Sequence, residues 1–293
     1  MRFTTFTTSV YLPCLILLCF CCQAGEKQSA SLIHEADWGK EAALSQVESI
    51  CFDSAHDLYY VSNGKAYQPG VEGFISRFSA QGDVLETHWI DSLQRPTGMA
   101  VKGDTLFVAD VDRLLAIDIE KGKIVQSYPS PIPNSGLNDV AISEAGDIYV
   151  SASFIHAIMK KEGDSLVLWM QDEKMLEYAN GLYISDGNLW VAGMQLSQVE
   201  LETQKMKKVE LPEGVQDFDG IYVGPNHELF LSTVENSALW FTDSRGGAKK
   251  LIDGQEHYLG DFHYEARGKL FIPRGSHEKG EYFISVTQFS PKK

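Results

Sequence analysis

Four residues with oxygen-bearing side chains recur at one phase of a repeated sequence pattern. Each opens a short alternating run of polar and apolar residues, and the four are Glu48, Asn138, Asn180 and Asp219. Carboxylate and amide oxygens suit Ca²⁺, which takes six to eight oxygen ligands in flexible geometry. The set contains no His or Cys, which disfavours zinc and softer metals, whereas another divalent cation such as magnesium stays open. The pattern therefore predicts a calcium-type metal site at these four residues.

The same residues have a plainer interpretation as turn residues. Short polar side chains such as Asn and Asp commonly bond nearby backbone at the starts of strands. Two features favour the metal site. All four residues share one phase of the repeat, and Glu48 is a poor turn residue.

The repeat also predicts the fold that positions these residues. Six segments follow one pattern, in which a polar or very small residue opens a strand, a tight turn follows and a second strand returns. Their first residues are spaced by 49, 41, 42, 39 and 41 positions, and they are Glu48, Thr97, Asn138, Asn180, Asp219 and Gly260. Two further strands recur in the later half of most units. Four short strands in about 40 to 45 residues are typical of a β-propeller blade, so we expect an all-β, six-bladed β-propeller.

The two ends of the repeat predict how the ring closes. The last unit supplies only three strands, at 261–265, 269–273 and 282–289, and the stretch 31–36 before the first unit is unassigned. We expect this N-terminal stretch to pair with 282–289 and to complete the sixth blade. Because the innermost strand of every blade lines the central channel, the residues that open these strands should converge at one mouth.

The N-terminal segment has the features of an export signal. Arg2 precedes an apolar run of about a dozen residues, shorter than the roughly 20 needed to span a bilayer. We therefore expect residues 1–24 to be a signal peptide and residues 25–293 to form one propeller domain. The run ends at Cys22 in a loose match to a bacterial lipobox. A soluble periplasmic or extracellular form and a lipid-anchored lipoprotein both stay open.

Cysteine use and charge narrow the function classes. Four of the 5 cysteines lie in the N-terminal segment, so a soluble mature chain keeps only Cys51 and has no disulfide framework. Cys51 lies in an apolar alternating run and is expected to be part of the core. The formal charge of −15, with no visible cluster of Lys and Arg, argues against a nucleic-acid partner and favours attraction of cations.

The units resemble the family of senescence marker protein, gluconolactonase and luciferin-regenerating enzyme over essentially all of the mature chain. The resemblance is carried by Glu48 and by the phrases LNDVAI, ANGLYI and FDGIYV, which contain Asn138, Asn180 and Asp219. In that family the matching Glu, Asn and Asp residues hold calcium or another divalent ion in the channel. The family's Glu-Gly-Pro is here Glu48-Ser49-Ile50, and the sequence shows no obvious substrate-binding Arg near the mouth. These two differences from the family bear on specificity for sugar lactones. All four predicted metal ligands are present.

The resemblance implies a metal-dependent hydrolase of a lactone or related ester with a small-molecule substrate, and the N-terminal segment predicts that this enzyme is exported. In such an enzyme the metal polarises the carbonyl, Asp219 is both ligand and catalytic base or nucleophile, and Glu48 mainly holds the ion. His263 is a second candidate base. It lies three positions after Gly260, so strand alternation points it away from the ligands unless a bulge intervenes. Asp261 has a similar register problem.

Other residues and other functions stay open at this point. Asn63, Asp110 and Asp112 end second strands, where they could line a substrate pocket or make turns. The competing function is a non-catalytic binding propeller in which a central calcium is structural. A lyase on a similar propeller would need His and Glu residues over the metal, which the sequence does not place.

Overall fold

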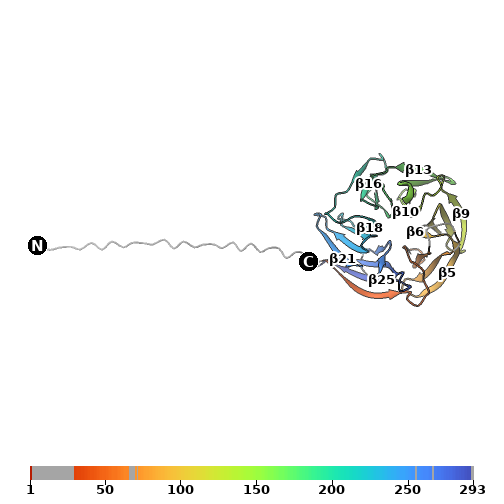
Figure 1. The fold of residues 1–293 in the computed structure, drawn as a ribbon, viewed down its shortest axis with the longest axis horizontal. Coiled ribbons are helices and arrows are strands. Elements are labelled where there is room, and N and C mark those ends of the chain that lie inside the picture. Colours follow the sequence, from red (N-terminus) through yellow and green to blue (C-terminus); the bar gives the residue numbers. More distant parts are fainter. Residues whose placement is uncertain (2–29, 66–69, 71, 255, 266, 292–293) are drawn as a thin grey trace.

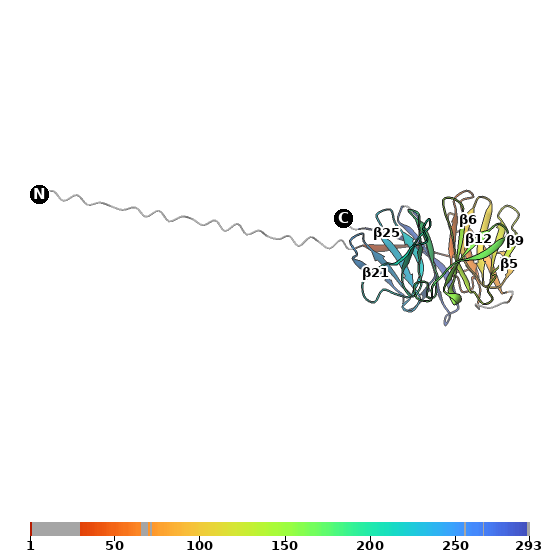
Figure 2. The same ribbon diagram turned by 90° about the horizontal axis from the view of Figure 1, so that it is seen from above.

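Six antiparallel sheets surround a central axis like the blades of a propeller (Figure 1). The structure is a computed structural model that describes Met1 and residues 30–65, 70, 72–254, 256–265 and 267–291. Seen from the side, the blades form a single thick ring (Figure 2). The predicted all-β, six-bladed propeller is confirmed. The predicted signal peptide lies, apart from Met1, outside the described residues. In the described part of the chain, no helix is long and apolar enough to cross a membrane.

The first three blades follow the chain from the channel outwards. The first blade comprises β2 (Ile50–Asp53), β3 (Leu58–Asn63), β4 (Gly73–Ser79) and β5 (Val84–Leu93). The second comprises β6 (Pro96–Lys102), β7 (Thr105–Asp110), β8 (Arg113–Asp118) and β9 (Lys123–Pro129). The third comprises β10 (Leu137–Ile142), β11 (Ile148–Ala152), β12 (Ala157–Glu162) and β13 (Ser165–Gln171), with the 3₁₀ turn η1 (Ser153–Ile155) after β11.

The next two blades repeat the same order. The fourth comprises β14 (Leu182–Ser185), β15 (Asn188–Val191), β16 (Ser197–Glu200) and β17 (Met206–Lys208). The fifth comprises β18 (Phe218–Val223), β19 (Leu229–Thr233), β20 (Ala238–Thr242) and β21 (Ala248–Asp253). The hairpin between β14 and β15 shows how local sequence sets the register. Asp186 and Gly187 both have positive φ, at 50° and 71°, which matches the two-residue turns favoured by Asp-Gly.

The sixth blade joins the two ends of the chain. Its innermost position is divided between β22 (Tyr258–Leu259) and β23 (His263–Glu265), followed by β24 (Lys269–Ser276) and β25 (Glu281–Ser290). Its outer strand is the N-terminal β1 (Ser31–Trp38), which pairs antiparallel with β25 from Ser31 opposite Ser290 to Trp38 opposite Ile284. The predicted closure by the N-terminal strand is confirmed.

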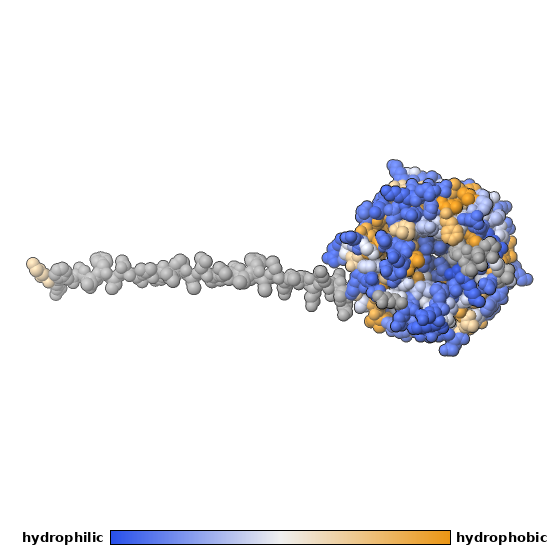
Figure 3. All heavy atoms as spheres, in the orientation of Figure 1, coloured by the Kyte–Doolittle hydropathy of each residue, from blue (hydrophilic) through white to orange (hydrophobic). Residues whose placement is uncertain are grey.

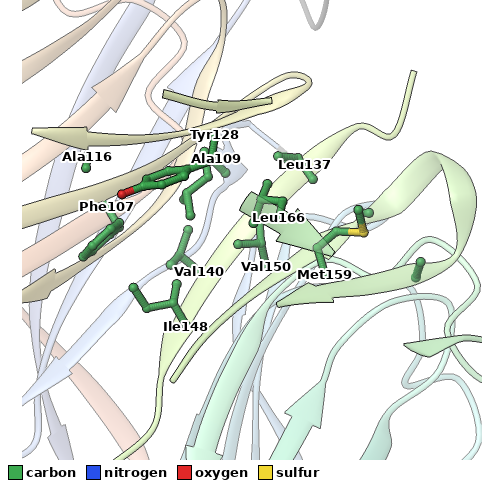
Figure 4. Packing of buried hydrophobic residues seen from close by; sticks show 13 residues of the cluster. Phe107, Ala109, Ala116, Tyr128, Leu137, Val140, Ile148, Val150, Met159 and Leu166 are labelled. Atoms are coloured by element: carbon green, nitrogen blue, oxygen red, sulfur yellow. The ribbon is translucent and has the colours of Figure 1, made fainter. Parts of the chain in front are cut away.

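The hydrophobic core lies between neighbouring blades. Figure 4 shows one such cluster, in which Phe107 and Tyr128 of the second blade pack against Val140, Val150 and Met159 of the third. Comparable clusters join the other blades, so each blade buries both faces against its neighbours. The face seen down the ring is mostly hydrophilic, with scattered hydrophobic residues (Figure 3). The packing holds the six inner strands rigidly around the channel.

Candidate functional site

A bulge near the start of the inner strands positions the candidate site. In β18, Phe218 lies opposite Thr233 but Ile221 lies opposite Leu231, so the inner strand has one extra residue. The same shift occurs in β6, between Pro96 and Met99, and in β10, between Leu137 and Val140. A bulge interrupts strict alternation. The residue that opens the strand and the residue after it can therefore both border the channel.

Three of the four predicted metal ligands interact within the channel. The Asn180 side chain lies close enough to the Asp219 carboxylate to lower its pKa, and Asp219 is only 8% exposed. The Glu48 carboxylate is close enough for the Asp219 charge to act on it. Adjacent blades are joined here by backbone hydrogen bonds from Gly181 N to Asp219 O at 2.8 Å and from Asp261 N to Glu48 O at 2.8 Å. The ring thus places the opening residues of separate blades next to one another.

Glu48 and Asp219 are disfavoured as two ionised carboxylates without a cation, because both are buried and the charge of Asp219 acts on Glu48. Burial raises the pKa of Glu48 well above its usual range, and the Asp219 charge raises it further. Burial also raises the pKa of Asp219 to about 7, although the Asn180 side chain and the Arg95 charge oppose the rise. One oxygen of Glu48, Oε2, is buried and has no hydrogen-bond partner among the residues that the structure describes. Buried carboxylate oxygens without partners are costly unless a cation or proton accompanies them.

Asn138 occupies the equivalent position at the start of β10 and is half-buried. Among the residues that the structure describes, no group of three or more His, Cys, Asp and Glu side chains lies close enough to hold a metal ion. The predicted set contains only two such side chains, and its other two members are amides. An oxygen-only set with an unpartnered carboxylate oxygen fits a hard divalent cation and not zinc.

Arg95 is a channel residue that the sequence did not reveal. It lies in the loop before β6, and its positive charge acts on Glu48, Asp219 and Tyr258. Its Nη1 donates a hydrogen bond of 3.0 Å to the carbonyl of Gln46. The signal that could have found it is its position two residues before Thr97, which opens the second unit. Arg95 supplies a cation at the mouth beside the candidate ligands.

A second pair of carboxylates lies one residue further along the inner strands. Oδ2 of Asp139 accepts a hydrogen bond of 2.6 Å from Leu182 N of the next blade, and Oδ2 of Asp261 accepts one of 3.4 Å from the Ser49 hydroxyl. Burial raises the pKa of Asp139 to about 7 and that of Asp261 well above its usual range. These two groups tie neighbouring blades together inside the channel.

His263 borders this second layer. It lines a channel cavity of about 230 Å³ together with Asp139, Asp261 and Cys51, and this cavity does not include Glu48 or Asp219. The interruption between β22 and β23 accounts for its orientation, because strict alternation from Gly260 would have turned it away. Its ring lies 5.8 Å from Phe52, and burial lowers its pKa to about 4. The structure therefore places His263 in the channel and not beside Asp219.

Cys51 is a free thiol in the first inner strand. It packs against the hydrophobic cluster between the first two blades and is half-buried. Burial and the Asp53 charge raise its pKa to about 12, which keeps it protonated at neutral pH. Cys51 is therefore an inert part of the channel wall, as expected from the sequence.

Three polar residues at the ends of second strands hold the loops of the mouth. Asn63 accepts a hydrogen bond of 3.0 Å from Ser45 N. Asp110 is fully buried, accepts hydrogen bonds of 2.8 Å from Arg95 N and 2.7 Å from Arg113 Nη2, and so fixes the loop that carries Arg95. Asp112 accepts a hydrogen bond of 3.0 Å from the Ser135 hydroxyl, in the loop before β10. Their role is in turn structure, which was one of the two alternatives.

Solved structures with the same fold have different activities. A gluconolactonase from Xanthomonas campestris is 16% identical, with 89% of this chain and 90% of that chain covered and a TM-score of 0.65. Virginiamycin B lyase from Staphylococcus aureus is 14% identical, with 90% and 89% covered and a TM-score of 0.60. The WD40 propeller domain of Doa1 is 15% identical, with 84% and 79% covered and a TM-score of 0.59. Comparison with sequence family profiles and with curated proteins gives no match. The likeness to gluconolactonase-type propellers is confirmed for the fold.

Proposed function

We propose that this protein is an exported, metal-dependent hydrolase of a small lactone or related ester. Calcium is the preferred ion, held by Glu48, Asn138, Asn180 and Asp219, and another divalent cation would also suit the oxygen set. The observation that carries the proposal is the buried, unpartnered Oε2 of Glu48, whose carboxylate experiences the charge of Asp219. A divalent cation would satisfy that oxygen and remove the repulsion.

The bound ion would polarise a substrate carbonyl and stabilise the negative charge that develops on its oxygen. Asp219 is the proposed base or nucleophile, because it is the buried carboxylate that already interacts with Asn180. Asn180 lies beside that carboxylate and would help to orient it. Glu48 mainly neutralises the ion. His263 stays a secondary candidate base, and it would act from the adjoining channel cavity.

The proposed setting follows from the N-terminal sequence. An apolar run that follows Arg2 is typical of export to the periplasm or the exterior, and Cys22 would allow a lipid anchor. Such an anchor is the only proposed membrane association. The partner is a small molecule, because the acidic chain disfavours nucleic acids.

A non-catalytic binding propeller is the second candidate function. It is favoured by the shared fold of the WD40 domain of Doa1, which covers 84% of this chain at a TM-score of 0.59. In that case the calcium would stabilise the ring and the mouth would present a binding surface. Loss of the Asp219 charge should abolish the activity of a hydrolase but should leave the binding function of a non-catalytic propeller.

Paired substitutions at the two carboxylates separate the candidates. Asp219→Asn keeps an oxygen ligand but removes the base or nucleophile, so hydrolysis of a lactone or ester should fall at least about a hundredfold. Glu48→Gln should weaken calcium affinity first, with activity partly recovered at high calcium. Asp243→Asn, in an exposed turn of the fifth blade, is the matched control and should be unaffected. Full activity of Asp219→Asn would remove the proposed catalytic role and leave the binding function.

A further inference from the structure

A second cavity lies outside the channel, where the N-terminal strand closes the ring. It has a volume of about 470 Å³ and lies among β1, β24, β25 and the segment before β22. None of its lining residues belongs to the inner strands of the first five blades. Its charged lining includes Asp37, Lys40, Glu256, His257 and Arg274.

Two buried nitrogen atoms at this cavity make no hydrogen bond with any residue that the structure describes. Nε of Arg274 is buried without a hydrogen bond, and this side chain makes no ion pair with any residue that the structure describes. Nε2 of His257 is also buried and makes no hydrogen bond within the described part of the chain, and its contact with the Glu281 carboxylate, at 3.7 Å, is too long for one. A buried donor without a partner is costly and usually indicates a bound water or ion. A guanidinium cannot avoid that cost by losing its proton.

The acidic residues at the cavity are already paired with lysines. Asp37 lies 2.8 Å from Lys40 Nζ, and Glu256 lies 3.8 Å from Lys279 Nζ. Asp253 likewise has a lysine partner. Charges of Asp37 and Glu256 act on Arg274, yet neither carboxylate is within ion-pair distance of it. Arg274 therefore lines the cavity with a buried Nε that has no hydrogen-bond partner among the described residues.

We propose that this cavity binds a small oxyanion, a carboxylate or a phosphate, through Arg274 and His257. The planar guanidinium can donate two parallel hydrogen bonds to either group, and His257 adds a third donor through Nε2. Asp37, Asp253 and Glu256 also border the cavity. Their charges favour a singly charged ligand over a polyanion. The inference is independent of the channel chemistry.

Calorimetric titration of the whole mature protein with acetate, and separately with phosphate, tests this site. At least one of the two anions should bind saturably, with a Kd of about 1 mM or tighter. Arg274→Met should weaken that binding at least about tenfold, because hydrogen bonds to charged groups contribute that much. Arg245→Met, at an exposed arginine paired with Asp243, is the matched control and should bind like the wild type.

The titration distinguishes the two kinds of anion and can also overturn the proposed site. Binding of acetate alone identifies a carboxylate site, binding of phosphate alone identifies a phosphate site, and binding of both supports the shared chemistry. If Arg274→Met does not fold, Arg274→Lys takes its place, since an ammonium keeps the charge but loses the paired donors. The absence of saturable binding in the wild type would overturn the proposal. Unchanged affinity in the Arg274 variant that folds would also overturn it.

Discussion

Four buried carboxyl groups in the channel influence one another's protonation. Glu48, Asp139, Asp219 and Asp261 each have a pKa that burial raises, and the charges of neighbouring carboxylates raise it further in each. Arg95 is the cation that acts on two of them, Glu48 and Asp219. Such a cluster would be destabilising as four free anions. The divalent ion that we propose would offset that repulsion.

His263 gives a prediction about pH and stability. Its folded-state pKa of about 4 is below its ordinary value of 6.5, so the unfolded chain binds more protons between these pH values. Stability from His263 is therefore present above pH 6.5 and is lost as the pH falls towards 4, by up to about 3 kcal/mol. His263→Phe should reduce this loss, because phenylalanine has no group to protonate and its ring would still lie near Phe52 and Phe271.

Urea unfolding at pH 4.5 and 6.5, compared between wild type and variant, measures the effect. The difference between wild type and variant cancels the contribution of the channel carboxyl groups, which changes with pH in the opposite sense and is common to both proteins. His34→Phe, at an exposed histidine on β1, serves as the control. An equal loss of stability in the His263 variant and the wild type would show that His263 is not buried in its neutral form.

At the scale of elements, the bulge in the inner strands requires glycine where neighbouring blades approach. A Cβ on Gly98 would lie 2.0 Å from Oδ1 and 2.5 Å from Cα of Asp139, in the adjacent blade. Gly98→Ala should therefore destabilise the ring by about 2 kcal/mol or more, the range for overpacking a fixed backbone. Gly70→Ala is the control, because its Cβ would meet no atom of the described residues within 4 Å. Chemical denaturation gives both values, and equal stabilities would contradict the close approach.

The N-terminal strand gives a second prediction at this scale. The Trp38 ring packs 5.5 Å from Tyr59 and 5.1 Å from Phe271, so β1 joins the first and last blades as well as pairing with β25. Trp38→Ala should lower the free energy of unfolding by about 3 kcal/mol. Ile33→Ala, on the same strand but 59% exposed, should change it little. An unchanged melting temperature for Trp38→Ala would contradict the role of β1 in closing the ring.

For the whole molecule, the repeat was enough to predict the architecture. The spacing of the opening residues predicts the six blades. The missing strand in the last unit predicts that β1 closes the ring. The bulges were not predictable, because they depend on the register between strands and leave little trace in composition. Strict strand alternation therefore predicts that Asp261 and His263 point away from the channel, whereas both line the channel cavity in the structure. The sequence does not reveal Arg95, because its place at the mouth depends on a hydrogen bond from its backbone N to Asp110, which the repeat pattern does not show.

The shared fold does not settle the activity, because structures of similar shape include a gluconolactonase, a lyase and a WD40 domain. Function must therefore be argued from the channel residues. Their oxygen-only chemistry and raised pKa values favour a metal ion, and Asp219 beside Asn180 offers a carboxylate for hydrolysis.

The most direct test measures hydrolysis by the wild-type protein before and after chelation. A panel of δ-lactones and aryl esters is assayed in calcium, after treatment with a chelator, and after calcium is restored. The account predicts hydrolysis of at least one substrate, a loss of at least about a hundredfold without the metal, and recovery when calcium returns, because the metal supplies several kcal/mol of charge stabilisation. No hydrolysis of any substrate, or rates unchanged by chelation, would contradict the account.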